Sequence, residues 1–263
     1  MGSLGICGNP CRRFAVLLCA EDSEYVRETY GGYFGVFKAM LAEDEDGSEA
    51  WDLFRAVSGD LPGDAEAELY DGFVITGSCS DAHGDDLWIQ QLVSFVKKVD
   101  SMRKKILGVC FGHQILSIAV GGKVGRAKSW DISLRTVQLS PTLTPISSLN
   151  LPSSLSIIEC HRDEVKELPP KAEVIARSNQ TGIEMFRYGN NIMGIQGHPE
   201  YTKDILLYLI DRLLQRGFIE KPYAEELKAN IEVCEPDREA WRKLCVTFLK
   251  GDLKGDLCSE FDN

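Results

Sequence analysis

The sequence predicts an α/β fold: an open, mostly parallel sheet with helices on both faces, plus a small antiparallel layer. In the first half of the chain, short apolar runs alternate with amphipathic runs, which is typical of parallel strands joined by helices. After Gly122 the pattern changes to short strand-like runs separated by turns, which indicates the antiparallel layer. In open sheets of this class, functional residues gather at the carboxyl ends of strands.

The first half of the chain is expected to contain four strands and three helices. The apolar runs predict strands over residues 14–20, 51–57, 69–76 and 104–109. The amphipathic runs predict helices over residues 23–42, 85–102 and 112–120. Gly31 and Gly32 interrupt the first helix, and the acidic residues 43–49 are expected to form a solvated loop.

The second half is expected to contain shorter strands and then helices. The strands are predicted over residues 134–139, 155–159, 173–177, 183–188 and 191–196, with a charged turn at 160–164. A strongly amphipathic helix follows over 202–215, and residues 222–249 form one or two helices divided at Pro236.

The chain is expected to hold one catalytic domain over residues 14–250, because no Pro/Ser-rich linker and no internal repeat divides it. Residues 1–13 are expected to form a mobile arm without a secretory signal, and the polar, acidic residues 251–263 a frayed tail.

Composition excludes several classes of function. The 263 residues include 29 Lys and Arg against 40 Asp and Glu, and the net charge of −11 argues against binding to nucleic acid. No apolar run is long enough to span a membrane. The nine cysteines show no framework spacing, which favours a reducing compartment and therefore the cytosol. No pair of His or Cys has the spacing of metal ligands, and no metal or other cofactor is expected.

The sharpest motif follows the fourth predicted strand, where Gly108–Gly112 reads Gly-Val-Cys-Phe-Gly before a helix. This is the pattern of a nucleophile on a tight strand-to-helix turn, in which side chains at the two glycines would collide with the backbone. The turn places Cys110 at a helix N-terminus, which favours a thiolate. The N–H of Phe111 is then free to stabilise an oxyanion. The alternative is a buried structural cysteine.

A general base is available in His198, which follows another predicted strand in a Gly-His-Pro-Glu turn. Glu200, two residues further on, can orient the imidazole. His113 lies one helical turn after Cys110 and is an alternative base, while His83 is expected to be solvated.

These motifs resemble those of class I glutamine amidotransferases, over roughly residues 14–215. GVCFGHQ at 108–114 is similar to the family's nucleophile motif and GHPE at 197–200 to its histidine–glutamate motif. The resemblance implies a flavodoxin-like fold and a triad of Cys110, His198 and Glu200. It also implies an oxyanion hole formed by Gly77, Ser78 and Phe111. The residues that it implies for binding the glutamyl substrate are Gln114, His161 and Asp163. Ser78 and Cys79 depart from the family's oxyanion-loop pattern.

Further segments, including DGFVITGS at 71–78 and CHRDEV at 160–165, resemble the plant gamma-glutamyl peptidases. That resemblance implies a cytosolic cysteine hydrolase of sulfur-containing defence-compound (glucosinolate) pathways. It implies cleavage of the γ-glutamyl bond of glutathione or its S-conjugates through a glutamyl thioester that releases glutamate. The expected partner is therefore a small γ-glutamyl substrate.

Two other functions are open at this point. The protein is alternatively a glutaminase subunit that supplies ammonia to a separate synthase chain, or a non-catalytic binding protein on the same fold. Only about 48 residues follow the glutaminase-like region, too few for a synthase domain, so no obligatory synthase partner is expected.

Overall fold

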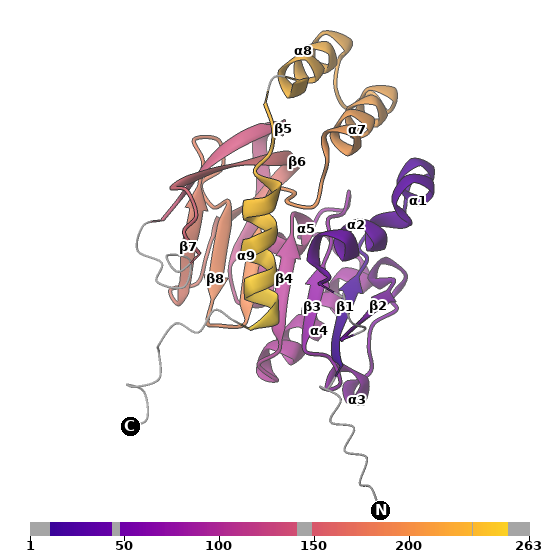
Figure 1. Ribbon diagram of the computed structural model, residues 1–263, viewed down its shortest axis with the longest axis vertical. Coiled ribbons are helices and arrows are strands. Elements are labelled where there is room, and N and C mark those ends of the chain that lie inside the picture. Colours follow the sequence, from indigo (N-terminus) through magenta and orange to yellow (C-terminus); the bar gives the residue numbers. More distant parts are fainter. Residues whose placement is uncertain (1–10, 44–47, 141–148, 233, 252–263) are drawn as a thin grey trace, which may run out of the picture.

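The computed structural model describes residues 11–43, 48–140, 149–232 and 234–251 (Figure 1). Most of the expected N-terminal arm, acidic loop and C-terminal tail lies outside these ranges. The strands are β1 (Arg12–Leu17), β2 (Glu49–Phe54), β3 (Gly72–Ile75), β4 (Lys105–Val109), β5 (Lys123–Leu139), β6 (Ser154–Glu167), β7 (Ala172–Arg177), β8 (Met185–Tyr188) and β9 (Ile192–Ile195). The helices are α1 (Glu24–Tyr30), α2 (Gly32–Leu41), η1 (Ala56–Ser58), α3 (Asp64–Ala67), α4 (Leu87–Ser101), α5 (Phe111–Ala119), α7 (Lys203–Gln215), α8 (Lys221–Glu232) and α9 (Arg238–Lys250).

The described strands form a single nine-stranded sheet in the order β2-β1-β3-β4-β9-β8-β7-β5-β6. The strands from β2 to β9 in this order are parallel to one another, and β8, β7, β5 and β6 continue the sheet with antiparallel pairing. The α/β prediction is therefore confirmed, and the antiparallel strands extend the main sheet.

The apolar run of β1 is continuous because both faces of the sheet are covered. Phe14 and Val16 point into one hydrophobic cluster, whereas Ala15 and Leu17 point into another, as the two-residue period of a strand requires. All four side chains are fully buried.

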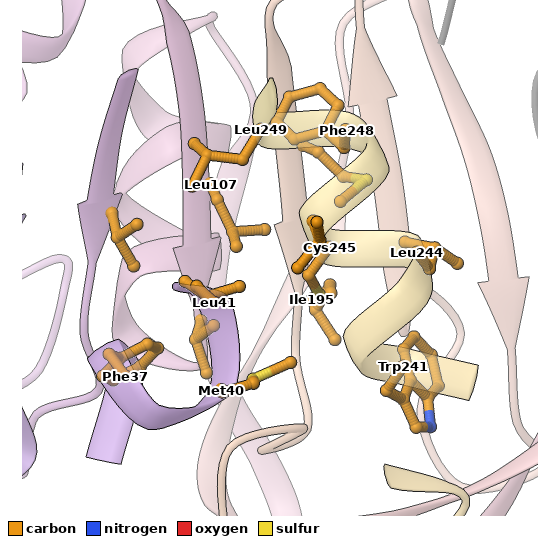
Figure 2. Packing of buried hydrophobic residues seen from close by; sticks show 14 of the residues in the cluster. Phe37, Met40, Leu41, Leu107, Ile195, Trp241, Leu244, Cys245, Phe248 and Leu249 are labelled. Carbon is orange, nitrogen blue, oxygen red and sulfur yellow. The ribbon is translucent and has the colours of Figure 1, made fainter. Parts of the chain in front are cut away.

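Helices α2 and α9 cover one face of the sheet (Figure 2). Trp241 and Phe248 of α9 pack in the same cluster as Phe37 and Leu41 of α2. Trp241 is 1% exposed, and its indole N–H donates to the Ser156 carbonyl at 3.1 Å, so a C-terminal helix is anchored to β6. Helices α4 and α5 supply Leu92, Phe95, Ile115 and others to the cluster on the opposite face.

A third cluster packs α7 and α8 against β5 and β6. Ile205, Leu206 and Ile210 of α7 are fully buried there and pack with Val26 of α1 and Ile158 of β6. Helix α7 is therefore fixed against β6, the strand at the edge of the sheet.

Several boundaries differ from the expectations. The first strand begins at Arg12, inside the expected N-terminal arm. The strands expected at 134–139 and 155–159 are parts of the long strands β5 and β6, and residues 160–164 are strand, so the predicted turn there is wrong. The two strands are held together by backbone hydrogen bonds along most of their length. Much of β5 is polar and half-exposed, so no apolar run in the sequence shows how long that strand is.

Other expectations are confirmed. The helix expected at 23–42 is divided into α1 and α2 at Gly31, whose φ of 73° lies in the left-handed region. Two helices, α8 and α9, follow α7 and lie on either side of Pro236. None of the helices in the described ranges combines the length and hydropathy that a bilayer-spanning segment needs.

We expect Trp241→Ala to lower the free energy of unfolding by about 3–5 kcal/mol, because it leaves a cavity between α9 and the sheet. Urea denaturation followed by circular dichroism measures this loss. The matched change Leu69→Ala, at a side chain that is 59% exposed, should alter stability by less than about 0.5 kcal/mol. Equal losses in the two variants would show that α9 does not anchor the core.

Candidate active site

Three neighbouring parallel strands end at one edge of the sheet. Strands β3, β4 and β9 lie side by side, and the chain runs directly from their carboxyl ends into Gly77, Cys110 and His198 respectively. The order of the strands therefore brings together residues that are more than 30 positions apart in the sequence. This is the edge at which α/β sheets hold their functional sites.

Cys110 sits on a strained turn between β4 and α5. Its φ of 53° and ψ of −103° lie in a region that side-chain-bearing residues rarely adopt. A Cβ atom on Gly108 would fall 2.6 Å from the Gly112 carbonyl carbon, and one on Gly112 would fall 2.3 Å from the Ile75 carbonyl oxygen. Both glycines are therefore required by close backbone contact, as the sequence predicts.

Burial controls the protonation of Cys110. The residue is 5% exposed, and its backbone N–H donates to the Ile195 carbonyl at 2.8 Å. Burial raises the pKa of the thiol well above its ordinary value, nearby Glu159 and Glu200 raise it further, and the contact with the Phe111 N–H opposes the rise. The sequence predicts a thiolate favoured by the helix N-terminus; in the free protein, desolvation outweighs that effect. A nucleophilic role for Cys110 would therefore require a base.

His198, the predicted base, lies close to Cys110. Its Nδ1 lies 2.8 Å from Glu200 Oε1, and the Tyr201 ring stacks on the imidazole at a centroid distance of 3.9 Å. A Cβ atom on Gly77 would lie 3.0 Å from His198 Cε1 and 3.7 Å from Cys110 Cβ, so imidazole and thiol flank the same glycine. With Nδ1 held by the carboxylate, Nε2 is the nitrogen left for proton transfer.

Two pockets meet at Cys110. The first, of about 520 Å³, includes Gln114, Arg126, His161 and Asp163, and we call this part the β6 lobe. The second, of about 310 Å³, includes Tyr33, Gly77, His198 and Tyr201, and we call it the His198 lobe. The residues that line both pockets are Ser78, Cys79, Ser80, Cys110, Cys160, Leu209, Arg212 and Arg216.

The β6 lobe holds the predicted substrate-binding residues. His161 and Asp163 lie on β6 rather than in a turn, and both are at least 94% buried. Gln114 of α5 donates from Nε2 to the Asp163 carbonyl oxygen at 2.8 Å, which joins the helix after the nucleophile to the edge strand. Arg126 Nε lies 3.1 Å from Asp163 Oδ1, so a cation already accompanies this carboxylate.

A metal ion fits poorly in this lobe. Ligand atoms of Asp81, His83 and Asp163 lie within 4.8 Å of one another, which is close enough for a shared cation. However, the Arg126 guanidinium group is paired with both carboxylates, at 2.7 Å from Asp81 and 3.1 Å from Asp163. Its positive charge would repel a cation bound between them.

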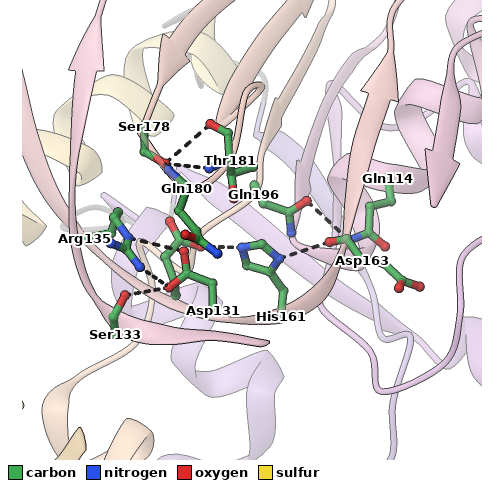
Figure 3. Close-up of polar contacts among 11 residues, drawn as sticks. Gln114, Asp131, Ser133, Arg135, His161, Asp163, Ser178, Gln180, Thr181 and Gln196 are labelled. Atoms are coloured by element: carbon green, nitrogen blue, oxygen red, sulfur yellow. Dashed lines mark hydrogen bonds and ion pairs between the residues drawn. The ribbon is translucent and has the colours of Figure 1, made fainter. Parts of the chain in front are cut away.

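A buried polar cluster lies behind the β6 lobe (Figure 3). His161 Nδ1 lies 3.0 Å from the Asp163 carbonyl oxygen, and Nε2 lies 3.4 Å from Glu159 Oε2. Asp131 forms an ion pair with Arg135 at 2.7 Å. Burial raises the pKa of Glu159 well above its ordinary value and that of Glu184 to about 9, with further increases from nearby carboxylates. Glu184 is therefore protonated at neutral pH.

This cluster supports the histidine turn directly. A Cβ atom on Gly197 would fall 2.5 Å from Glu159 Oε1, so the carboxyl group touches the backbone beside His198. The His198 backbone N–H donates to the Ile158 carbonyl at 2.7 Å. The position of His198 therefore depends on β6.

The structure does not place the other candidate histidine in the pockets. His113 is fully buried, packs on Phe186 at a centroid distance of 5.0 Å, and approaches Gly194 of β9. Burial lowers the pKa of His113 to about 3, so it stays neutral within the core. Its contacts are those of a packing residue between α5 and the sheet.

Sequence reasoning missed Tyr201, Glu159, Arg126 and Arg212 as parts of the site. A signal exists for Glu159, because Glu159, His161 and Asp163 alternate along β6 and are all buried. Acidic residues at alternating strand positions indicate a polar cluster on one face. For Arg212 the sequence offers only an ordinary charged position in an amphipathic helix.

The family model described as glutamine amidotransferase class-I matches residues 57–205. Gamma-glutamyl peptidase 5 of Arabidopsis thaliana is 49% identical over 247 residues, covering 92% of this chain and 97% of that protein. Gamma-glutamyl peptidase 3 of the same plant is 45% identical, with coverage of 91% and 97%. A solved glutamine amidotransferase from Thermotoga maritima aligns with a TM-score of 0.69 at 17% identity, covering 93% of this chain and 99% of that one, and this likeness concerns the fold alone.

We expect Glu184→Gln to stabilise the protein by about 2–3 kcal/mol at pH 7. The pKa of Glu184 is raised from 4.5 to about 9 on folding, so its contribution is complete below about pH 4.5 and is lost as the pH rises towards 9. A glutamine side chain does not ionise, so the variant does not lose folding stability as the pH rises. Urea denaturation of both proteins at pH 5, 7 and 8.5 measures the difference, which should grow with pH.

The control for this change is Glu68→Gln, at an exposed position. Its difference from the unmodified protein should be the same at each pH. If the difference in unfolding free energy between the Glu184→Gln variant and the unmodified protein were also the same at each pH, the buried carboxyl group would be ionised in the folded protein.

Proposed function

The chain belongs to the class I glutamine amidotransferase family, and on this premise we propose that Cys110, His198 and Glu200 act as nucleophile, general base and orienting carboxylate. Relatives named gamma-glutamyl peptidases share 43–49% identity over most of the chain, and the protein is a γ-glutamyl hydrolase. The observation that carries the residue assignment is that His198, bonded to Glu200, and Cys110 meet at Gly77 at the sheet edge.

The proposed reaction begins with proton transfer from the Cys110 thiol to His198 Nε2. The sulfur attacks the γ-carbonyl carbon of the glutamyl group, and the carbonyl becomes an oxyanion. His198 then donates its proton to the leaving nitrogen as the carbon–nitrogen bond breaks, which leaves a glutamyl thioester. Water, deprotonated by His198, cleaves the thioester and releases glutamate and the free thiol.

The raised pKa of the thiol fits this sequence of steps. A thiol that stays protonated in the empty site loses its proton only when His198 accepts it, so attack and proton transfer are coupled. Glu200 stabilises the imidazolium that forms, because its carboxylate faces Nδ1 at 2.8 Å.

The oxyanion hole is proposed to use backbone N–H groups. Phe111 is the first residue of α5, and its N–H is not needed within the helix. Gly77 and Ser78 follow β3 and line the wall opposite, where Gly77 lies close to both Cys110 and His198. In enzymes of this kind, one such donor contributes about 10²–10³ in rate.

The proposed substrates are glutathione and its S-conjugates, with the glutamyl group in the β6 lobe. There Asp163, Gln114 and His161 face the site, and Asp163 provides a carboxylate for the glutamyl ammonium. Trp130 and Phe218 line the same pocket with their ring centroids 6.3 Å apart, and Phe218 is 55% exposed. These two rings suit the apolar substituent of a conjugate.

The remaining parts of the proposal concern context. Residues 14–250 act as one catalytic domain, without a cofactor and without an obligatory synthase partner. The cytosol is the proposed location, because the cysteine spacing fits a reducing compartment.

We expect Cys110→Ala to abolish turnover of every γ-glutamyl substrate while the fold is retained, because no other group supplies the covalent step. Glutamate release from glutathione measures activity, and thermal denaturation checks the fold. The matched variant Cys234→Ala, at an exposed thiol outside both pockets, should keep normal activity. Residual turnover in the Cys110→Ala protein would contradict the assignment.

A panel of substrates separates the proposal from a glutaminase subunit. The purified protein alone should release glutamate from glutathione and from S-hexylglutathione at rates well above its rate with glutamine. A glutaminase subunit would show the opposite order or would be nearly inert without a synthase. Faster hydrolysis of glutamine than of both glutathione substrates would overturn the proposed specificity.

A further inference from the structure

Arginine side chains gather at the junction of the two pockets. Arg212 in the last turn of α7 and Arg216, which caps the C-terminus of that helix, line both pockets, and Arg162 of β6 lines the first. In the described part of the chain, none of these three has a carboxylate partner within ion-pair distance, whereas Arg126 nearby has two. In a chain of net charge −11, unpaired guanidinium groups on one pocket wall indicate a site for an anion.

The direction of Arg212 follows from its neighbours. Burial raises the pKa of the Tyr33 phenol to about 12, and the nearby Arg212 guanidinium opposes that rise. Tyr33 lies 6.2 Å from Tyr201 between ring centroids, and Tyr201 stacks on His198. Tyr33, Tyr201, His198 and Arg212 line the same pocket, so Arg212 lies on the side of the site where His198 stands.

The two pockets that Arg212 and Arg216 share differ in their other lining residues. Gln114, Arg126 and Asp163 line only the first pocket, while His198 and Tyr201 line only the second. In the proposed reaction, His198 gives its proton to the leaving nitrogen, so the leaving group lies on the His198 side of Cys110. The arginines that reach this side are Arg212 and Arg216.

We infer that Arg212 and Arg216 bind a carboxylate at the far end of the leaving group, which makes them the residues that select carboxylate-terminated γ-glutamyl amides. This inference rests on the proposed function for the side on which the leaving group lies. The group recognised is the terminal carboxylate of a cysteinyl-glycine unit. Arginine suits it because a guanidinium group binds a carboxylate through two parallel hydrogen bonds.

The other carboxylate in such a substrate belongs to the glutamyl group itself. Its amino group is assigned to Asp163 in the β6 lobe, where Arg126 is the arginine within reach of Asp163. The two carboxylates of one substrate would thus meet different arginines, and an experiment can block each carboxylate separately.

The test measures binding by calorimetry in the Cys110→Ala protein, so that turnover is not needed. The ligands are S-hexylglutathione, its glycine carboxamide and its glutamyl α-carboxamide. We expect the glycine carboxamide to bind about 10- to 100-fold more weakly than the parent ligand. Adding Arg212→Gln or Arg216→Gln should bring the ratio of the two dissociation constants close to one.

Controls separate this role from a general loss of binding. Adding Arg238→Gln, at an exposed position on α9, should leave the 10- to 100-fold ratio unchanged. The ratio between the parent ligand and the glutamyl α-carboxamide should be the same with and without Arg212→Gln. Thermal denaturation checks that each variant is folded, and exposed Arg216 provides the second variant if Arg212→Gln does not fold.

Three outcomes would overturn the inference: equal binding of the parent and the glycine carboxamide, a ratio that survives both arginine changes, or loss of discrimination at the glutamyl end instead. The proposed function fails separately. If the protein with Cys110 intact hydrolyses none of the three ligands but the binding ratios are as expected, the arginine site stands and the hydrolytic proposal falls.

Discussion

The site depends on the contact between backbone atoms beneath Cys110. Gly108 at the end of β4, Gly112 in the first turn of α5 and Ile75 at the end of β3 lie so close that no side chain fits between them. This contact fixes the direction in which α5 leaves the sheet and holds Cys110 at a φ of 53°. The same packing brings the end of β3 against the turn, so Gly77, which follows β3, and Cys110 are positioned together.

The local parts of this arrangement could be predicted from the sequence, because short spacing determines them. The strand, the two glycines and the cysteine between them fall within a few residues, as do His198 and Glu200. The extent of β5 and β6 could not be predicted, because their stability comes from pairing with each other rather than from an apolar run. For the same reason His161 and Asp163 are expected in a turn, and the structure shows them on a strand.

The site also depends on acidic side chains that are buried behind the pocket. Glu159 and Glu184 lie behind the pocket, both are at most 2% exposed, and burial raises the pKa of both carboxyl groups. Sequence reasoning treats a glutamate as a surface charge, so this buried acidic cluster was not foreseen. The Glu159 carboxyl group touches Gly197, so a buried acid supports the turn that holds His198.

The placement of α7 has an evolutionary consequence. The helix begins three residues after Glu200, packs on β6 through its own apolar face, and carries Arg212 and Arg216 on the pocket side. The groups of the β6 lobe come from other segments, namely β5, β6 and α5. Under the proposed assignment, the residues that hold the glutamyl group and those that select the leaving group therefore belong to different segments of the chain. Substitutions along one helix could then change which amine is released without altering the residues proposed to hold the glutamyl group.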